Sequence, residues 1–417
     1  MSTTDAVPNP QVVLGVAGGI AAYKVAQLLR LLTESGHEVR VVPTAAALEF
    51  VGAATWEALS GHPVSADVWA QAHEVPHVSL GRNADLVIVA PATADLLARA
   101  AHGMANDLLT NVLLTARCPV VMAPAMHTEM WEHPATQANV ATLRQRGVIV
   151  LDPAEGRLTG TDTGKGRLPE PLELFDTVQQ VLRRGHAGRD FEGQAVLVSA
   201  GGTREHIDPV RFLGNRSSGL QGFAIAAAAA RRGAEVTLVA ANVALPTPVG
   251  VKRIDVVSAD DLHREVMQAA TGADVVVMAA AVADFRPIST STYKIKKSDD
   301  EFQVPEPVAL ERTADVLADL VAHRTSGQIL VGFAAETGDE SGDVLAHGRR
   351  KIVRKGCDLL VVNDVGPGGA FESATNEVVI LTAHGGQESV PRANKQAVSD
   401  AIWDAVSMWG KGREAAH

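Results

Sequence analysis

Residues 196–222, VLVSAGGTREHIDPVRFLGNRSSGLQG, decide the fold expected for the rest of the chain. The stretch begins with an apolar, β-branched run typical of a buried parallel strand, and Gly201 and Gly202 follow it. Two glycines after a strand let the backbone approach a ligand closely. The turn at 217–219 then leads into an alanine-rich helix expected at 223–232, whose N-terminus favours an anion. The pattern predicts the start of a nucleotide-binding α/β domain, with another complete domain before it.

Asn215 lies between these two glycine-containing turns, and it is the polar residue that we expect to take part in chemistry in this half. The same residues also fit two ordinary turns with Asn215 in the left-handed conformation. The residues alone leave both interpretations open.

Composition limits the classes of function. The 417 residues exceed the usual size of one domain, so two domains are expected. The 37 basic and 48 acidic residues give a net charge of -11, which argues against nucleic acid or an anionic membrane as a partner. The first ten residues, MSTTDAVPNP, lack the basic and apolar regions of a secretory signal. The chain has only two cysteines, Cys118 and Cys357, which is consistent with a reducing compartment, and we expect a cytoplasmic protein.

The first half alternates strands and helices. Strands are expected at 11–16, 38–42, 85–90, 119–123 and 148–151, with a helix at 20–35 after the first of them. Each strand ends in a small or polar loop, and ligands of open α/β sheets bind at that edge. The GGIA sequence lacks the spacing of GxGxxG, so a mononucleotide such as a flavin phosphate fits better than a dinucleotide.

The second half repeats the alternation. Further strands are expected at 235–240, 274–279, 328–332 and 358–362. Between the halves, a glycine-rich segment at 156–167 predicts a mobile flap over the first crevice. We expect a flavin-binding domain at 1–183, a linker at 184–191 and a nucleotide-binding domain at 192–417, both of them doubly wound parallel sheets.

Signals for hydrolases and tightly bound metals are weak. The sequence contains no HExxH, GxSxG or Walker A motif. Asp284, which follows an expected buried strand, is a candidate carboxylate for magnesium at a bound nucleotide. His77 is expected in a loop before an extended stretch, where a lone histidine is more often structural. The basic run at 293–297 fits a solvated loop as well as a phosphate site.

Longer motifs carry a resemblance. The first half contains GGIAAYK, HVSL, PATADLLARAAHGMANDLL and PAM, and resembles flavin-dependent cysteine decarboxylases. The second half contains SAGGTRE, DPVRFLGNRSSG, AAAVADFR, KIKK, VGFAAET and VVND, and resembles phosphopantothenate–cysteine ligases. In this order they resemble the bifunctional phosphopantothenoylcysteine decarboxylase/phosphopantothenate–cysteine ligase family of coenzyme A synthesis. The resemblance implies a flavodoxin-like first domain and a Rossmann-like second domain.

For the second half, the resemblance implies that 4'-phosphopantothenate is joined to L-cysteine at the expense of CTP, with Mg²⁺, through an acyl-cytidylate held by Asn215. Matching positions imply the following CTP contacts: Ala279, Ala280, Asp284 (also on the metal), Lys294, Ala314, Asp315, Val316, Leu317, Phe333, Lys351 and Lys355. They imply the following substrate contacts: Gly201, Gly202, Arg204, Arg211, Ser217 and Ser218.

For the first half, the resemblance implies FMN-dependent decarboxylation of phosphopantothenoylcysteine to 4'-phosphopantetheine, with His77 as the active-site base. The implied FMN contacts are Gly18, Gly19, Ile20, Thr44, Ala92, Thr93 and Asn106, and Met126 is an implied substrate contact. Two residues depart from the family pattern. His127 stands where an asparagine is common, and its imidazole can still bind the substrate carboxylate. Gly160 stands where the flap commonly carries a cysteine, and Asp162 is then the candidate proton donor.

The resemblance also implies a homo-oligomer, in which trimeric decarboxylase halves and paired ligase halves build a dodecamer. An alternative remains open because of His127 and Gly160. In it the second half is a working ligase, and the first half is a flavin-binding assembly or regulatory module without decarboxylase activity.

Overall fold

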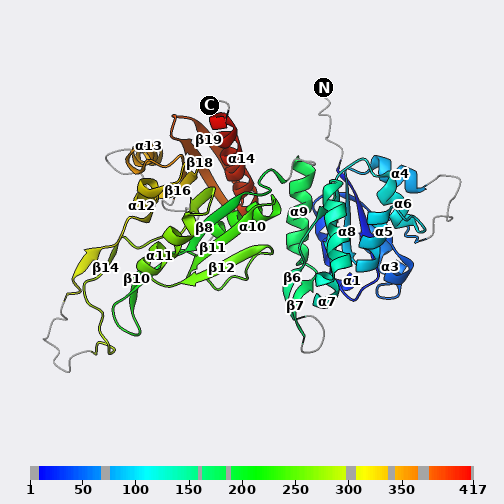
Figure 1. Cartoon of the computed structure of the whole chain (residues 1–417), viewed down its shortest axis with the longest axis horizontal. Helices are drawn as coiled ribbons and strands as arrows, with labels where there is room; N and C mark the ends of the chain where they lie inside the picture. The colour runs from blue at the N-terminus through cyan, green and yellow to red at the C-terminus, as the bar shows by residue number, and fades with distance from the viewer. Residues whose placement is uncertain are drawn as a thin grey trace. The chain divides into compact units, whose positions relative to one another are not determined.

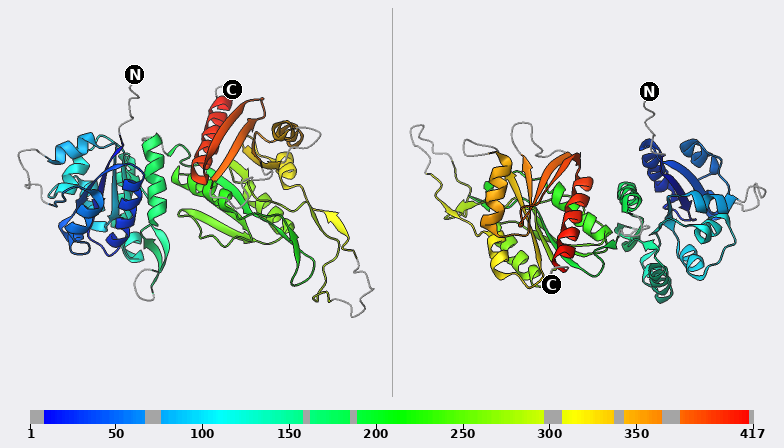
Figure 2. Two further views of the ribbon diagram at one scale, coloured as in Figure 1. Left: turned by 180° about the vertical axis from the view of Figure 1, so that it is seen from behind. Right: turned by 90° about the horizontal axis from the view of Figure 1, so that it is seen from above.

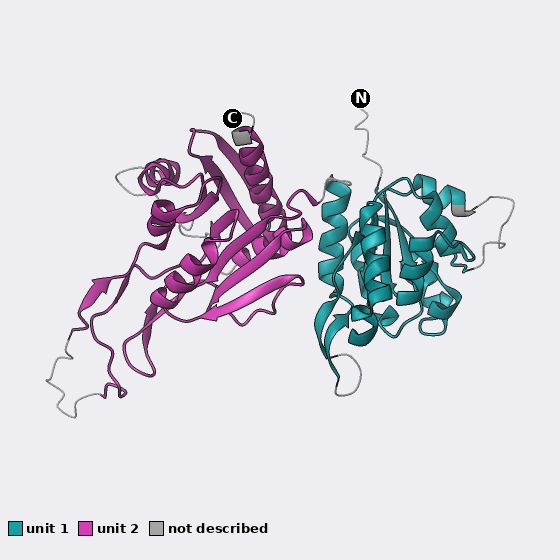
Figure 3. Cartoon of the chain, viewed as in Figure 1, with its two compact units in different colours: residues 1–188 teal, residues 189–417 magenta. Residues whose placement is uncertain are grey.

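The computed structural model describes residues 9–66, 76–157, 162–184, 189–296, 307–336, 343–364 and 375–414. The chain divides into two compact units, unit 1 at residues 1–188 and unit 2 at residues 189–417 (Figure 3). Each unit has its own β-sheet and its own hydrophobic clusters. Gly160 and Lys297 lie outside the described residues.

Unit 1 contains a five-stranded parallel sheet in the order β2-β1-β3-β4-β5. Its strands are β1 (Gln11–Val16), β2 (Glu38–Pro43), β3 (Leu86–Ala92), β4 (Val120–Pro124) and β5 (Ile149–Val150). This is the flavodoxin-like strand order, whose direction of winding reverses between β1 and β3. The predicted fold class of the first half is confirmed. Strands β1 and β3 are apolar runs because both of their faces are covered by helices.

Helices cover both faces of this sheet (Figure 1). They are α1 (Ala22–Glu34), α2 (Ala45–Leu48), α3 (Ala53–Ser60), α4 (Pro76–Asn83), α5 (Ala94–His102), α6 (Leu108–Thr115), α7 (Thr128–Glu132), α8 (Pro134–Gln145) and α9 (Pro171–Arg184). Side chains of α1, α3 and α9 pack in one hydrophobic cluster, and side chains of α5, α6 and α8 pack in the other. The strand side chains alternate between the two clusters, as Leu14 and Val13 do.

The glycine-rich segment is more regular than predicted. Its described parts form an antiparallel hairpin of β6 (Ala154–Arg157) and β7 (Thr163–Arg167). The Met126 amide donates to the Gly166 carbonyl at 3.0 Å, and a Cβ at Gly164 would lie 2.3 Å from the Thr128 hydroxyl. Glycine therefore serves here to let the hairpin pack closely on the start of α7.

Unit 2 has an eight-stranded sheet in the order β12-β11-β8-β13-β16-β17-β18-β19. The parallel strands are β8 (Ala195–Gly201), β11 (Glu235–Ala241), β12 (Val251–Val256), β13 (Val275–Met278), β16 (Ile329–Glu336) and β17 (Leu359–Asp364). In chain order they follow the 3-2-1-4-5-6 pattern of the Rossmann fold, which reverses between β8 and β13. The predicted doubly wound parallel sheet is confirmed, and two strands that the sequence did not predict, β18 (Thr375–Thr382) and β19 (Gln387–Asn394), extend it antiparallel.

The helices of unit 2 also lie on two faces (Figure 2). They are α10 (Leu220–Arg231), α11 (Ala259–Ala270), α12 (Val316–His323), α13 (Val344–Lys355) and α14 (Lys395–Glu414). Helices α10 and α14 share one hydrophobic cluster, and α11, α12 and α13 contribute to the other. Arg232, which is fully buried, joins Asp190 to Asp404 and lies 4.7 Å from the ring centroid of Phe191. This arginine fixes the start of unit 2 against α10 and α14.

Two short hairpins extend from the second sheet (Figure 1). One is formed by β9 (Arg204–His206) and β10 (Phe212–Gly214), and the other by β14 (Phe285–Pro287) and β15 (Leu310–Arg312). Among the described residues, no helix is both long and apolar enough to cross a membrane.

Candidate functional sites at the two sheet edges

The reversal point of the first sheet brings three predicted loops together. The Ala17 amide donates to the Pro91 carbonyl at 3.1 Å, and the Thr44 amide donates to the Val16 carbonyl at 2.8 Å. The loops after β1, β2 and β3 therefore meet at the carboxyl edge. A Cβ at Gly18 would lie 2.4 Å from the Cβ of Ala46, so only glycine permits this approach. A Cβ at the neighbouring Gly19 would lie 3.8 Å from Thr93 Cγ2, an ordinary van der Waals contact.

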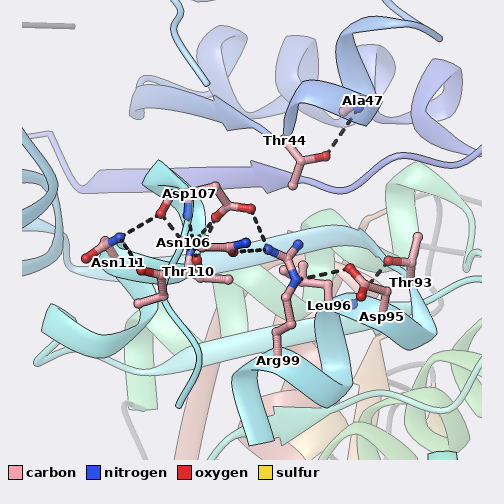
Figure 4. Close-up of polar contacts among 11 residues, drawn as sticks. Thr44, Ala47, Thr93, Asp95, Leu96, Arg99, Asn106, Asp107, Thr110 and Asn111 are labelled. Carbon is pink, nitrogen blue, oxygen red and sulfur yellow. Dashed lines mark hydrogen bonds and ion pairs between the residues drawn. The ribbon is translucent and has the colours of Figure 1, made fainter. Parts of the chain in front are cut away.

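Three helices begin at this edge, and their N-terminal ends differ in how they are capped. Thr44 and Thr93 cap α2 and α5: their hydroxyl oxygens accept from the amides of Ala47 at 3.2 Å and Leu96 at 3.3 Å (Figure 4). Each hydroxyl keeps its own hydrogen for a further acceptor. The N-cap of helix α1 is Ala21, whose side chain cannot cap it, and the positive end of the helix dipole suits a phosphate. Exposed Ile20 and Met104 add apolar surface. These groups fit a flavin mononucleotide.

Asn106 lies between α5 and α6 and is held by Arg99. The Arg99 guanidinium donates through Nη1 to Asn106 Oδ1 at 2.7 Å and to Asp107 Oδ2 at 2.8 Å (Figure 4). Asp107 forms a capping box with Thr110 at the start of α6. Burial favours a raised pKa of Asp107, but hydrogen bonds from Thr110 and Arg99 outweigh it and lower that pKa. The carboxylate is therefore charged at neutral pH.

The expected decarboxylase residues lie on several elements. His77 belongs to the first turn of α4, so the prediction of a loop followed by an extended stretch was wrong; Pro76 begins a helix here. The side chain of His77 lies outside the described set. His127 is exposed as the N-cap of α7, directly after Met126, which the hairpin binds. Asp162 is exposed next to β7.

Neither cysteine is poised to act as a thiolate. Burial raises the pKa of Cys118, which precedes β4, and burial raises the pKa of Cys357 in unit 2 to about 11. Both are free thiols, and at neutral pH both stay protonated.

In unit 2, the loops after β8 and β13 meet at the second reversal point. Gly202 bridges to Ala281, and the Ala281 amide donates to the Gly201 carbonyl at 2.8 Å. Two buried hydroxyls that the sequence reasoning missed hold the same loop. Ser199 Oγ accepts from the Ala280 amide at 3.1 Å, and Thr203 Oγ1 accepts from the Ala283 amide at 2.9 Å.

Asn215 joins this loop from the other side. Its Nδ2 donates to the Val282 carbonyl at 2.9 Å, which leaves Oδ1 and one N–H for a ligand. Asn215 is not left-handed, because the one described non-glycine residue with positive φ is Asn242. Asn242 Nδ2 donates to the Gly202 carbonyl at 2.9 Å and thereby stabilises the loop after β8. Ser217 and Ser218 precede Gly219, the N-cap of α10, which has no side chain to close the helix end.

A second group of expected CTP residues lies at α12 and α13. The Lys355 ammonium pairs with Asp315, which also caps α12 by accepting from the Ala318 amide at 3.2 Å. Burial favours a raised pKa of Asp315, but Lys355 and the cap amide outweigh it and lower that pKa. The neighbours Ala314, Val316 and Leu317 surround this cap, Lys351 lies one turn before Lys355 on α13, and half-buried Phe333 lies on β16.

Lys294, Arg204 and Arg211 lie on the projecting hairpins. The Arg211 guanidinium donates to the Ile295 carbonyl at 3.0 Å, and Asp208 accepts from the Ile295 amide at 3.2 Å. Arg204 lies 4.7 Å from the ring centroid of Phe212. These contacts hold the segment that carries Lys294 against the β9–β10 hairpin. The other expected CTP residues, Phe333 on β16 and Lys355 on α13, lie on different elements.

The expected metal carboxylate, Asp284, is exposed where the chain leaves β13 for β14. Among the described residues, no group of three histidine, cysteine, aspartate or glutamate side chains is placed to hold a metal. A magnesium ion would then take most of its ligands from nucleotide phosphates and water.

The fold and the sites define a two-domain α/β protein with a flavodoxin-like unit and a Rossmann-like unit. The family model described as Flavoprotein matches residues 1–183, and the model described as DNA/pantothenate metabolism flavoprotein C-terminal domain matches residues 191–409. The coenzyme A biosynthesis bifunctional protein CoaBC of Mycobacterium bovis is 58% identical over 403 residues, covering 95% of this chain and 96% of that relative. The chain belongs to this family of bifunctional coenzyme A biosynthesis proteins.

Two solved structures are each similar to one half. The C-terminal domain of a coenzyme A biosynthesis bifunctional protein CoaBC is 35% identical and covers 53% of this chain and 97% of that domain, with a TM-score of 0.44. The FMN-dependent cysteine decarboxylase SpaF is 36% identical and covers 39% of this chain and 91% of that protein, with a TM-score of 0.34.

Proposed function

We propose that unit 2 ligates L-cysteine to 4'-phosphopantothenate with CTP, and that unit 1 decarboxylates the product to 4'-phosphopantetheine with FMN. Family membership over nearly the whole chain supports both activities. The observation that carries the division of labour is the presence of two separate strand-end sites, one in each unit.

In the ligase reaction, the carboxylate of 4'-phosphopantothenate attacks the α-phosphate of CTP, forming an acyl-cytidylate and releasing pyrophosphate. The cysteine amine then displaces CMP. Lys355 and Lys351 would bind the phosphates, whose charge redistributes as pyrophosphate leaves, with Mg²⁺ at Asp284. Asn215, fixed by Val282, would orient the activated acyl group, and Arg204 and Arg211 would bind substrate. Ser199 and Thr203 hold the loop that carries Ala280 and Asp284.

In the decarboxylase reaction, a bound FMN would supply the reversible two-electron chemistry that decarboxylation of the cysteinyl moiety requires. The N-terminal end of α1 would lie at the phosphate of FMN, and Thr44, Thr93 and Asn106 would hydrogen-bond to the cofactor. His77 would take the substrate proton, and His127 would hold the carboxylate that is lost as CO₂. Asp162 is the candidate donor of the final proton, since Gly160 has no side chain to give one.

The purified chain is expected to be yellow, to release CO₂ from phosphopantothenoylcysteine and to form 4'-phosphopantetheine. Mass spectrometry of products from the wild type and Asp162→Asn checks this, with the variant expected to accumulate the oxidised enethiol. A yellow wild type that ligates but releases no CO₂ would support the alternative, a flavin-binding module attached to a working ligase. The departures at His127 and Gly160 leave room for that alternative, whereas the presence of His77 favours the enzyme.

We also propose a homo-oligomer, up to a dodecamer, that is held through both units. The support is the projecting β9–β10 and β14–β15 hairpins, on which Phe212, Phe285, Ile288 and Tyr293 are exposed. Lys294 would then reach the site of a neighbouring subunit. Light scattering is expected to give an oligomer for the wild type and smaller species for a Phe285→Ser/Ile288→Ser variant. A monomeric wild type at working concentration would exclude the proposal.

The two free cysteines support a cytoplasmic location.

A further inference from the structure

We propose that Arg99 is a positioning residue of the flavin site, which acts by fixing the side-chain amide of Asn106 in one orientation. The inference rests on the proposed placement of FMN at the β1–β3 edge. Arg99 lies on α5 with 16% of its side chain exposed, and Figure 4 shows its guanidinium between Asp95 on one side and Asn106 and Asp107 on the other.

The contacts of Arg99 use its planar fork. Nε donates to Asp95 Oδ2 at 3.0 Å, and Nη1 donates to Asn106 Oδ1 at 2.7 Å and to Asp107 Oδ2 at 2.8 Å. Asp95 and Asp107 together carry two negative charges against the one positive charge of Arg99, so the cluster presents no net positive charge to a ligand and the role proposed for Arg99 is orientation. Burial lowers the pKa of Arg99, but Asp107 and Asp95 outweigh it and raise that pKa, so the fork stays protonated.

This fork decides which way the Asn106 amide faces. A guanidinium has only donors, so it binds the amide oxygen and repels the amide NH₂ group. With Oδ1 held by Arg99, Nδ2 points away from the fork, and Asn106 is exposed in the connection between α5 and α6. The residue therefore presents two N–H donors to a ligand. Without Arg99, the amide is free to rotate and present its oxygen instead.

A donor at this position suits flavin. The ring carbonyls and unprotonated ring nitrogens accept hydrogen bonds, and they become more electron-rich when the ring is reduced. Fixed N–H groups therefore bind the flavin and favour its reduced form. An unfixed side chain must be immobilised on binding, which costs about 0.5–1.5 kcal/mol, or roughly 3- to 10-fold in affinity. Arg99 avoids this cost because Asn106 is already fixed.

The test is a double-mutant cycle on the apoprotein, with FMN affinity measured from quenching of flavin fluorescence. Arg99→Met is expected to weaken FMN binding about 3- to 10-fold and to make the reduction potential of bound flavin more negative. Asn106→Ala is expected to weaken it about 10-fold through loss of the hydrogen bond. The double variant should match Asn106→Ala alone, because Arg99 acts through that amide. Arg99→Lys, which keeps the charge without the fork, should fall between wild type and Arg99→Met.

Two variants separate positioning from general damage to α5 and α6. Arg146→Met removes a guanidinium that donates to the Ala101 carbonyl on α5 at 2.5 Å and does not contact Asn106. Thr110→Val removes the capping box of α6 and leaves the Arg99–Asn106 contact in place. Both should keep wild-type FMN affinity and the wild-type absorbance spectrum of bound flavin.

The outcomes that overturn the inference are distinct. If the double variant loses FMN affinity by the product of the two single losses, Arg99 acts independently of Asn106. If Arg146→Met loses as much FMN affinity as Arg99→Met, the loss reflects general damage to α5. A loss in Asn106→Ala with none in Arg99→Met would refute the role of Arg99 alone. Unchanged FMN affinity in Asn106→Ala would instead refute the placement of the flavin, which belongs to the proposed function.

Discussion

Asn215→Ala is expected to lower kcat/KM for ligation by about 100-fold, the scale seen when one donor to a charged intermediate is removed. In the structure Asn215 contributes its amide to the loop after β13, where Nδ2 donates to the Val282 carbonyl. Asn215→Asp should be informative in a different way. It keeps the size of the side chain but sets a carboxylate against that carbonyl. Pyrophosphate release should then persist while CMP release slows, so that the acyl-cytidylate accumulates.

The measurement follows pyrophosphate, CMP and ligated product separately in rapid-quench reactions. The chain supplies two controls. Asn394→Ala removes an exposed asparagine whose Oδ1 accepts from the Ala397 amide at 2.8 Å, and it should cost stability of about 1 kcal/mol without changing ligation. Decarboxylation of added phosphopantothenoylcysteine by unit 1 should be unchanged in every variant. Wild-type ligation by Asn215→Ala would remove this residue from the reaction.

Gly201→Ala is expected to destabilise unit 2 and to abolish most of its ligase activity. Gly201 has a φ of 86°, and an added Cβ would lie 2.1 Å from the Ala241 carbonyl oxygen, a backbone atom that cannot move aside. Left-handed strain and overpacking together cost about 3 kcal/mol, which corresponds to a fall in Tm of about 6–12 °C. The shift would also displace Gly202 from its bridge to Ala281 at the proposed nucleotide site.

Gly272→Ala is the matched control, because nothing lies within 4 Å of its added Cβ and its φ is not positive. It should unfold at nearly the wild-type temperature in calorimetry and ligate normally. If Gly201→Ala behaves like Gly272→Ala in both assays, the close approach after β8 is not required for the site.

The sequence was most informative where strands are buried on both faces. Apolar runs predicted β1, β4 and β11 to within a residue of their ends, since covering helices leave little polar alternation. The edge strand β12, with the sequence VKRIDV, carries three charged residues and was not predicted. Strands β18 and β19 were missed as well, and with them the antiparallel edge of the second sheet.

The sites show the same division. Loops after buried strands could be predicted to gather at one edge, and they do, because the parallel sheet itself imposes this. The contact of Asn215 with Val282 spans 67 residues and depends on where two loops cross, which no local pattern encodes. Arg99 escaped notice because a basic residue in the last turn of a helix is ordinary, favoured by the helix dipole alone. Ser199 at the end of β8 and Thr203 in the loop after it were not predicted either, because a buried serine or threonine is common and its sequence does not reveal which amide it binds.

The N-caps of helices α1 and α10 are Ala21 and Gly219, and neither residue has a side chain that can accept a hydrogen bond from the helix amides. On the proposed assignment, the phosphates of the cofactor and of the substrate complete these two helix ends. Ligand at 100 times its Kd then adds about 2.7 kcal/mol to the folded state. Chains that lack flavin or nucleotide would open more often and be degraded sooner. The cellular abundance of this enzyme would thus follow the supply of its flavin cofactor and of its nucleotide substrate.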